Sequence, residues 1–82
     1  MTNRTGIQPE PILDVLKTQF EVPAETTADT GFESLDLDSL VLIELAVILT
    51  KQYGIDVAGE ELAAAGNVAK VAELLTAKGT GS

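Results

Sequence analysis

Ser39 is the residue of this chain that is best placed to do chemistry. It stands at the head of the only long apolar run, inside the tripeptide Asp38-Ser39-Leu40. A serine that opens a helix turns its hydroxyl toward water and lies beside unpaired backbone N–H groups. A phosphate bonded to that oxygen would meet these donors and the positive end of the helix dipole. If Ser39 bears such a group, the chain is a carrier and not a catalyst.

Other chemical roles for this region are excluded by the residues around it. Segment 36–39 begins with the acid spacing of a calcium loop, but Val41 and Val47 stand where an EF-hand needs glycine and glutamate. As a hydrolytic nucleophile Ser39 lacks a base, because Lys51 lies about three helical turns away. A pair of catalytic carboxylates would need a cleft, for which a chain this short has little room. We therefore expect no catalytic residue and no metal site.

The composition is that of one small acidic domain. The 82 residues include 13 acidic and 5 basic ones, which gives a net charge of −8. This charge repels nucleic acid and anionic membranes and favours basic protein surfaces as partners. Cysteine and histidine are both absent from the sequence, so thiol chemistry and the commonest general base and metal ligand are missing as well.

The sequence also predicts where the protein works. Its first residues lack the basic and then apolar pattern of a signal peptide. The apolar run from Leu40 to Leu49 is interrupted by Glu44 and is too short to cross a bilayer. We expect a cytoplasmic protein without membrane contact, monomeric in isolation.

Apolar spacing predicts four helices and no sheet. The first helix spans Pro9 to Phe20, and the second spans Ser39 to Tyr53 between an Asp38 cap and Gly54. A short third helix covers residues 60–64, and a fourth covers 68–77 after an Asn67 cap. The predicted fold is therefore all-α, a small four-helix bundle with a long loop between the first two helices.

The loop and the chain ends complete this prediction. Residues 23–37 are rich in turn formers, and we expect Phe32, Leu35 and Leu37 to pin them to the core. Residues 55–57 are predicted as loop, since no second strand is present for them to pair with. The single domain is expected to span residues 1–82, with order over about 7–77 and flexible ends.

The second helix carries two apolar stripes. One faces the core and contains Leu42, Leu45, Ala46, Leu49 and Tyr53. The opposite stripe contains Leu40, Glu44, Val47 and Lys51, with Val41 and Ile48 on its flanks. A helix that is apolar nearly all round is either buried on several sides or presents a surface to a partner. In so small a domain we predict a partner-binding surface that begins beside Ser39 and consists of Leu40, Val41, Glu44, Val47 and Ile48.

In these features the chain resembles the acyl carrier proteins. Segment 35–45, with the sequence LDLDSLVLIEL, is similar to the attachment motif and second helix of that family. Phe32 resembles the aromatic residue that precedes the motif, and segment 53–57 resembles the stretch after the helix. The likeness extends from about Ile12 to Leu75.

The resemblance implies that Ser39 carries 4′-phosphopantetheine, transferred from coenzyme A by a phosphopantetheinyl transferase. The terminal thiol of this arm would hold acyl groups as thioesters and deliver them to a ketosynthase, an acyltransferase or ligase, a ketoreductase and dehydratase-type enzymes. Asp38 and Leu40 match positions used in transferase recognition. Glu44 matches an acidic recognition position, and Leu40 and Val47 match apolar contact positions.

The chain also departs from the family pattern. Val41, Thr50 and Lys51 stand where carriers of fatty-acid synthesis often have acidic residues. This difference favours a discrete carrier of a type II polyketide or related specialised pathway, and a fatty-acid pathway stays the other possibility. Peptidyl carriers, an alternative, usually reach the serine through a Gly-Gly-containing segment, which is absent here. An apolar cargo would find its nearest shelter in the core around residues 42, 46 and 49. A small helical adaptor without a prosthetic group, binding through Leu40 and Val47, is the alternative from another functional class.

Overall fold

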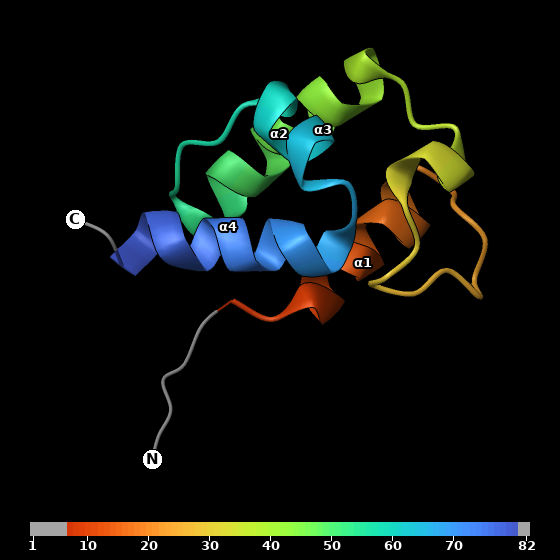
Figure 1. The fold of residues 1–82 in the computed structure, drawn as a ribbon, viewed down its shortest axis with the longest axis horizontal. Helices are drawn as coiled ribbons and strands as arrows, with labels where there is room; N and C mark the ends of the chain where they lie inside the picture. Colours follow the sequence, from red (N-terminus) through yellow and green to blue (C-terminus); the bar gives the residue numbers. More distant parts are fainter. Residues whose placement is uncertain (1–6, 81–82) are drawn as a thin grey trace.

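Four α-helices and one short 3-10 helix form the part of the chain that the computed structural model describes, residues 7–80. In chain order these are α1 (Pro9–Gln19), η1 (Phe32–Leu35), α2 (Ser39–Tyr53), α3 (Gly59–Ala65) and α4 (Val68–Thr80). Within this range the only β-type pairing is an isolated bridge between Gly31 and Asn67. Figure 1 shows α2 and α3 on one side of α4, with α1 next to the start of α4. The all-α prediction is confirmed.

Capping residues explain where α2 begins and ends. The Asp38 carboxylate accepts a hydrogen bond from the Val41 N–H at 3.0 Å, which satisfies a donor of the first turn. At the other end Gly54 adopts the left-handed conformation with φ of 68°, and its N–H donates to the Thr50 carbonyl at 2.8 Å. Both predicted caps and both predicted ends of this helix are confirmed.

The core lies between the inward faces of the four helices. Its members are the buried apolar side chains, which include Ile12, Leu16, Phe32, Leu42, Leu45, Ala46, Leu49, Leu62, Val68, Val71 and Leu75. The predicted core stripe of α2 is confirmed except at Tyr53, which is half-buried near the helix end and has a hydroxyl without a hydrogen-bond partner among the described residues.

The long loop before α2 is attached to the junction between α3 and α4. The Phe32 N–H donates to the Gly66 carbonyl at 2.8 Å, and the Ala69 N–H donates to the Ala28 carbonyl at 3.0 Å. The Phe32 side chain is buried, while Leu35 and Leu37 are half-buried, so Phe32 is the main anchor. The helix η1 within this loop is an element that turn-forming residues alone did not reveal, and it ends where Asp36 turns to a φ of 56°.

The C-terminal part of α4 corrects the sequence prediction. The helix does not end near Ala77 but continues to Thr80, so Gly79 is helical and not part of a flexible tail. Its last turn is held by an ion pair between Lys78 and Glu61 at 2.9 Å. Gly79 also lies beside Ile55, with which it lines a surface hollow. The flexible ends predicted for residues 1–6 and 81–82 lie outside the described residues.

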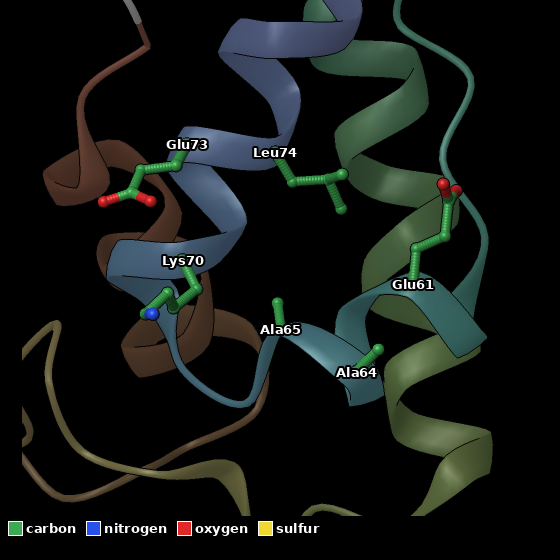
Figure 2. Close-up of a pocket in the computed structure, with 6 residues that line it drawn as sticks. All are labelled: Glu61, Ala64, Ala65, Lys70, Glu73 and Leu74. Atoms are coloured by element: carbon green, nitrogen blue, oxygen red, sulfur yellow. The ribbon is translucent and has the colours of Figure 1, made fainter.

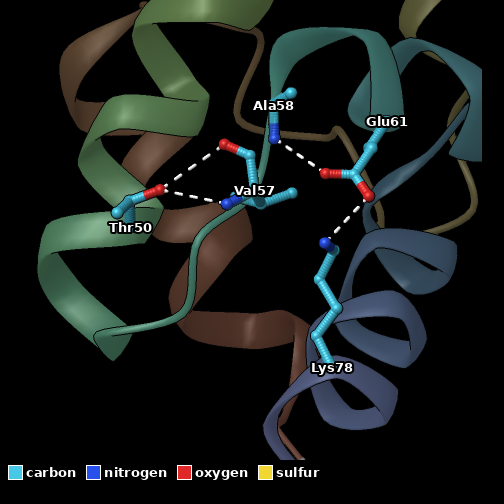
Figure 3. A network of polar contacts seen from close by, with 5 residues as sticks. All are labelled: Thr50, Val57, Ala58, Glu61 and Lys78. Carbon is cyan, nitrogen blue, oxygen red and sulfur yellow. Dashed lines mark hydrogen bonds and ion pairs between the residues drawn. The ribbon is translucent and has the colours of Figure 1, made fainter.

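A polar network connects α2, α3 and α4, as Figure 3 shows. The Thr50 hydroxyl accepts from the Val57 N–H at 3.3 Å and donates to the Val57 carbonyl at 3.5 Å. The Glu61 carboxylate accepts from the Ala58 N–H at 2.9 Å and pairs with Lys78. The ion pair with Lys78, followed by the Ala58 hydrogen bond, lowers the pKa of Glu61 below its ordinary value of 4.5.

The start of α3 packs unusually close to α2. A Cβ atom at Gly59 would lie 2.8 Å from the Ile43 side chain and 3.0 Å from its backbone N and Cα atoms. Only glycine permits this approach without a shift of one helix, because two of the three contacts are with backbone. Gly59 therefore sets the spacing between α2 and α3.

We expect Glu61→Gln to lower the thermal unfolding temperature modestly at neutral pH, because an exposed ion pair contributes little. A carboxylate with a lowered folded pKa adds stability above its unfolded pKa, and this stability is lost as pH falls through the folded value. The difference between wild type and variant should thus shrink below about pH 4.5. Thermal melts by circular dichroism across pH 3–7 measure it, and a difference that grows on acidification would contradict this role for Glu61.

Gly59→Ala should destabilise the domain by about 1–3 kcal/mol, because the new methyl group overlaps the Ile43 backbone. The matched control is Gly31→Ala, since a Cβ there would meet nothing closer than 3.8 Å. That variant should be neutral or slightly more stable, because alanine restricts the unfolded chain. Urea unfolding compares the two, and equal stabilities would show that the α2–α3 spacing tolerates a side chain.

Candidate functional site

Ser39 is the first residue of α2, and its side chain is exposed. The Asp38 carboxylate already occupies the Val41 N–H, but within residues 7–80 the N–H groups of Ser39 and Leu40 have no protein acceptor. These two free donors point out of the positive end of the helix. The arrangement suits a phosphate group on the Ser39 oxygen, as the sequence predicted.

A cavity of about 420 Å³ lies beside Ser39. Its walls come from the loop, η1, α2 and α3, and the lining residues are Gly31, Phe32, Glu33, Ser34, Leu37, Ser39, Leu42, Ala63 and Gly66. The hydrogen bond from Phe32 to Gly66 closes one wall, since both residues line the cavity. The lining is partly apolar and partly polar, with Glu33, Ser34 and Ser39 among its polar residues.

This cavity differs from the shelter predicted for an apolar cargo. Of the three core residues expected there, only Leu42 lines it. Ala46 and Leu49 are exposed by 3% and 0%, and they are packed among core side chains. Closely packed interiors leave few voids larger than a water molecule, so the space near Ser39 lies where the loop and α3 meet the start of α2, not among the core residues.

The outer face of α2 is apolar and exposed. Leu40 is 64% exposed, Ile43 52% and Val47 48%. Glu44 is exposed on the same face, whereas Val41 and Ile48 are half-buried on the flanks. The structure thus brings Leu40, Glu44 and Val47 together as predicted.

Ile43 is a surface residue that the sequence analysis missed. It lies three residues after Leu40 and four before Val47, which is the spacing of one helical face. The signal was therefore available in the sequence. It was hidden because every residue from Leu40 to Leu49 except Glu44 is apolar, which leaves open which side of the helix Ile43 takes. We define the outer face of α2 as Leu40, Ile43, Glu44, Val47 and Lys51, all exposed.

A groove of about 440 Å³ continues this face toward α3. It is lined by Ile43, Ala46, Val47, Val57, Ala58, Gly59 and Glu60. Two of its lining residues, Gly59 and Ile43, pack closely together, and a third, Val57, is hydrogen-bonded to Thr50. We call this the α2/α3 groove.

A separate hollow of about 450 Å³ lies between α3 and α4, and Figure 2 shows the side chains around it. Ala64, Ala65 and Leu74 supply apolar surface, and Lys70 and Glu73 project from α4. Ser39 does not line this hollow, so it is not continuous with the site. Residues 7–80 also hold no cluster of acidic side chains that could bind a metal ion, and no helix among them has the length and hydropathy to span a membrane.

Comparisons with known proteins agree with this geometry. The family model described as "Phosphopantetheine attachment site" matches residues 10–75. Polyketide-8 synthase acyl carrier protein 2 of Streptomyces avermitilis is 35% identical over 79 residues, which cover 94% of this chain and 91% of that protein. An acyl carrier protein of Rhodococcus erythropolis is 45% identical over 42 residues, which cover 50% of this chain and 46% of that protein. No solved structure matches significantly.

The family match covers most of the described helices, from α1 into α4. The Streptomyces relative aligns over nearly its whole length. Membership explains why an exposed serine at a helix start occurs in a chain without histidine or cysteine, since a carrier needs an attachment point and no catalytic base. The chain belongs to the acyl carrier proteins, non-catalytic subunits that bear a covalently attached 4′-phosphopantetheine.

Proposed function

We propose that Ser39 is the residue to which the phosphopantetheine is attached. The observation that carries this proposal is the exposed hydroxyl at the first position of α2, next to two N–H groups without an acceptor in the described chain. The sequence contains two other serines, Ser34 and Ser82. Ser34 is also exposed, but it lies inside η1 and not at the start of an α-helix with unpaired N–H groups. Ser82 lies outside the described residues.

The attachment reaction joins the Ser39 oxygen to the phosphopantetheine phosphorus of coenzyme A, and the bond from that phosphorus to the nucleotide half breaks. The hydroxyl proton must pass to a base. Within this chain no histidine exists, and Lys51 lies about three turns along α2. The transferase therefore supplies the base, while the free N–H groups of Ser39 and Leu40 favour the new phosphodiester.

The attached group supplies a terminal thiol, the only thiol of the protein, which holds acyl groups as thioesters. The chain's own contribution is to place this arm at a helix tip beside the cavity of Phe32, Ser34 and Leu42. We propose that the cavity receives the part of the arm or cargo nearest to Ser39. Its mixed lining accommodates both methylene and carbonyl groups, because the Ser34 hydroxyl can donate a hydrogen bond.

The pathway we propose is that of a type II polyketide synthase. The name of the Streptomyces relative supports this choice. The sequence of α2 supports it as well, because Val41, Thr50 and Lys51 stand where carriers of fatty-acid synthesis often have acidic residues. Family membership requires synthase enzymes and a phosphopantetheinyl transferase as partners. The specific partners we propose are a ketosynthase, an acyltransferase or ligase, a ketoreductase and a dehydratase-type enzyme. The cytoplasmic location, the monomeric state and the single domain over residues 1–82 stay predictions.

Incubation of the unmodified protein with coenzyme A, magnesium and a promiscuous transferase should add the mass of one phosphopantetheine. Ser39→Ala should abolish this gain, because the attacking oxygen is removed. The matched control is Ser34→Ala, which removes the other exposed serine of the same cavity and should leave the gain complete. Intact-mass spectrometry measures all three proteins.

A gain that persists in Ser39→Ala, or that disappears in Ser34→Ala, would place the attachment elsewhere. The alternative function, a small adaptor without a prosthetic group, predicts a different effect of two substitutions on activity. A protein that acts only through surface contact would keep its activity in Ser39→Ala and lose it in Val47→Asp.

A further inference from the structure

The charges on the outer face of α2 follow a fixed order. Going away from Ser39, Glu44 comes first, Val47 next and Lys51 last, and all three are exposed. Lys51 lies seven positions after Glu44, which places the two within about 20° around the helix and about 10 Å apart along it. The apolar surface of Val47 lies between the two charges. This face is therefore negative near Ser39 and positive at its far end.

The α2/α3 groove adds a second carboxylate at the negative end. Glu60 lines the groove together with Ile43 and is exposed. Because the neighbouring Gly59 packs directly against Ile43, Glu60 lies beside the half of α2 that is nearer to Ser39. At the opposite end the groove is bounded by Val57, which is bonded to Thr50, the residue before Lys51.

These charges have no partners within the described chain. The ion pair found in residues 7–80 joins Lys78 to Glu61, and it involves neither Glu44, Glu60 nor Lys51. Glu44 and Lys51 on the outer face of α2, and Glu60 in the α2/α3 groove, are thus free to be matched from outside. Complementary charges across an interface speed encounter and fix its register, whereas like charges brought together cost several kcal/mol.

We infer that the enzyme surface that docks here has the opposite charge order. It inserts an apolar side chain into the α2/α3 groove, places basic residues opposite Glu44 and Glu60, and carries a carboxylate opposite Lys51. Lys51 is then a residue that selects partners and sets the orientation of the docked carrier. This inference rests on the proposed function, because orientation matters only if the arm on Ser39 must reach the partner's active site.

A uniformly acidic helix would lack this orientation. It could lie on a basic surface in either direction along its axis, with similar charge energy. With Glu44 and Lys51 at opposite ends of the face, a reversed carrier would bring like charges together at both ends. The ordered charges therefore reject the reversed pose, and they also reject enzymes whose docking surface is basic throughout.

Lys51 also stands in the last turn of α2, where a positive charge interacts favourably with the helix dipole. This local effect changes stability but not the recognition of another protein. The two roles are separated by measuring both unfolding temperature and docking in the same variants. A matched control for net charge exists in Lys70, an exposed lysine on α4 at the hollow between α3 and α4 (Figure 2).

The experiment uses full-length protein loaded with phosphopantetheine and an acyl group, each variant checked by intact mass. The partner is a ketosynthase chosen because it accepts acyl groups from the loaded wild type. We expect Lys51→Glu to lower kcat/KM about tenfold, chiefly through KM, and Lys51→Gln to lower it about threefold. Lys70→Glu, with the same change in net charge, should stay within about twofold of wild type. The loss of kcat/KM in Lys51→Glu should become smaller at high salt, because salt screens the charges.

An unchanged or increased kcat/KM in Lys51→Glu would overturn the inference, because a uniformly basic partner gains from an added acid. An equal loss in Lys70→Glu would also overturn it, since net charge alone would then explain the effect. If the wild type takes up no phosphopantetheine, the proposed function itself fails and the inference falls with it. Loading that succeeds while the Lys51 variants behave like wild type rejects only the inference.

Discussion

The Val41 N–H donates a hydrogen bond to the Asp38 carboxylate at 3.0 Å, and this contact fixes Ser39 as the first residue of α2. Each residue of a helix turns by about 100° from the one before it, so the side chains that follow Ser39 divide between two faces of α2. Leu42, Leu45, Ala46 and Leu49 are buried in the core, whereas Leu40, Ile43 and Val47 are exposed. Ser39, the buried stripe and the outer face of α2 therefore keep a fixed angular relation on one helix.

The remainder of the fold holds this register in place. Phe32 is buried and its N–H is bonded to Gly66, so the long loop reaches the start of α2 along a defined path. The same contact forms one wall of the cavity beside Ser39. On the other side, Gly59 permits α3 to pack against Ile43 and creates the α2/α3 groove. The short helix α3 therefore contributes to both hollows: Ala63 lines the cavity, and Gly59 and Glu60 line the groove.

The apolar outer face of α2 is the least favourable feature of the domain in water. Leu40, Ile43 and Val47 are each about half or more exposed, and contiguous apolar surface of this kind promotes association. The net charge of −8 opposes self-association by repulsion between copies. On this face the apolar side chain of Val47 lies between the charges of Glu44 and Lys51, so the exposed surface is both apolar and charged.

Local sequence alone determined the four helices, the Asp38 and Gly54 caps and Ser39 as the candidate site, because spacing and capping are properties of neighbouring residues. It did not determine that α4 extends to Thr80, since the Lys78–Glu61 ion pair joins residues far apart in the chain. Nor did it show that Ile43 faces water or that a cavity lies beside Ser39. In a run that is apolar at every position but Glu44, the packing of α3 and the loop against α2 decides which side chains are covered and where space remains.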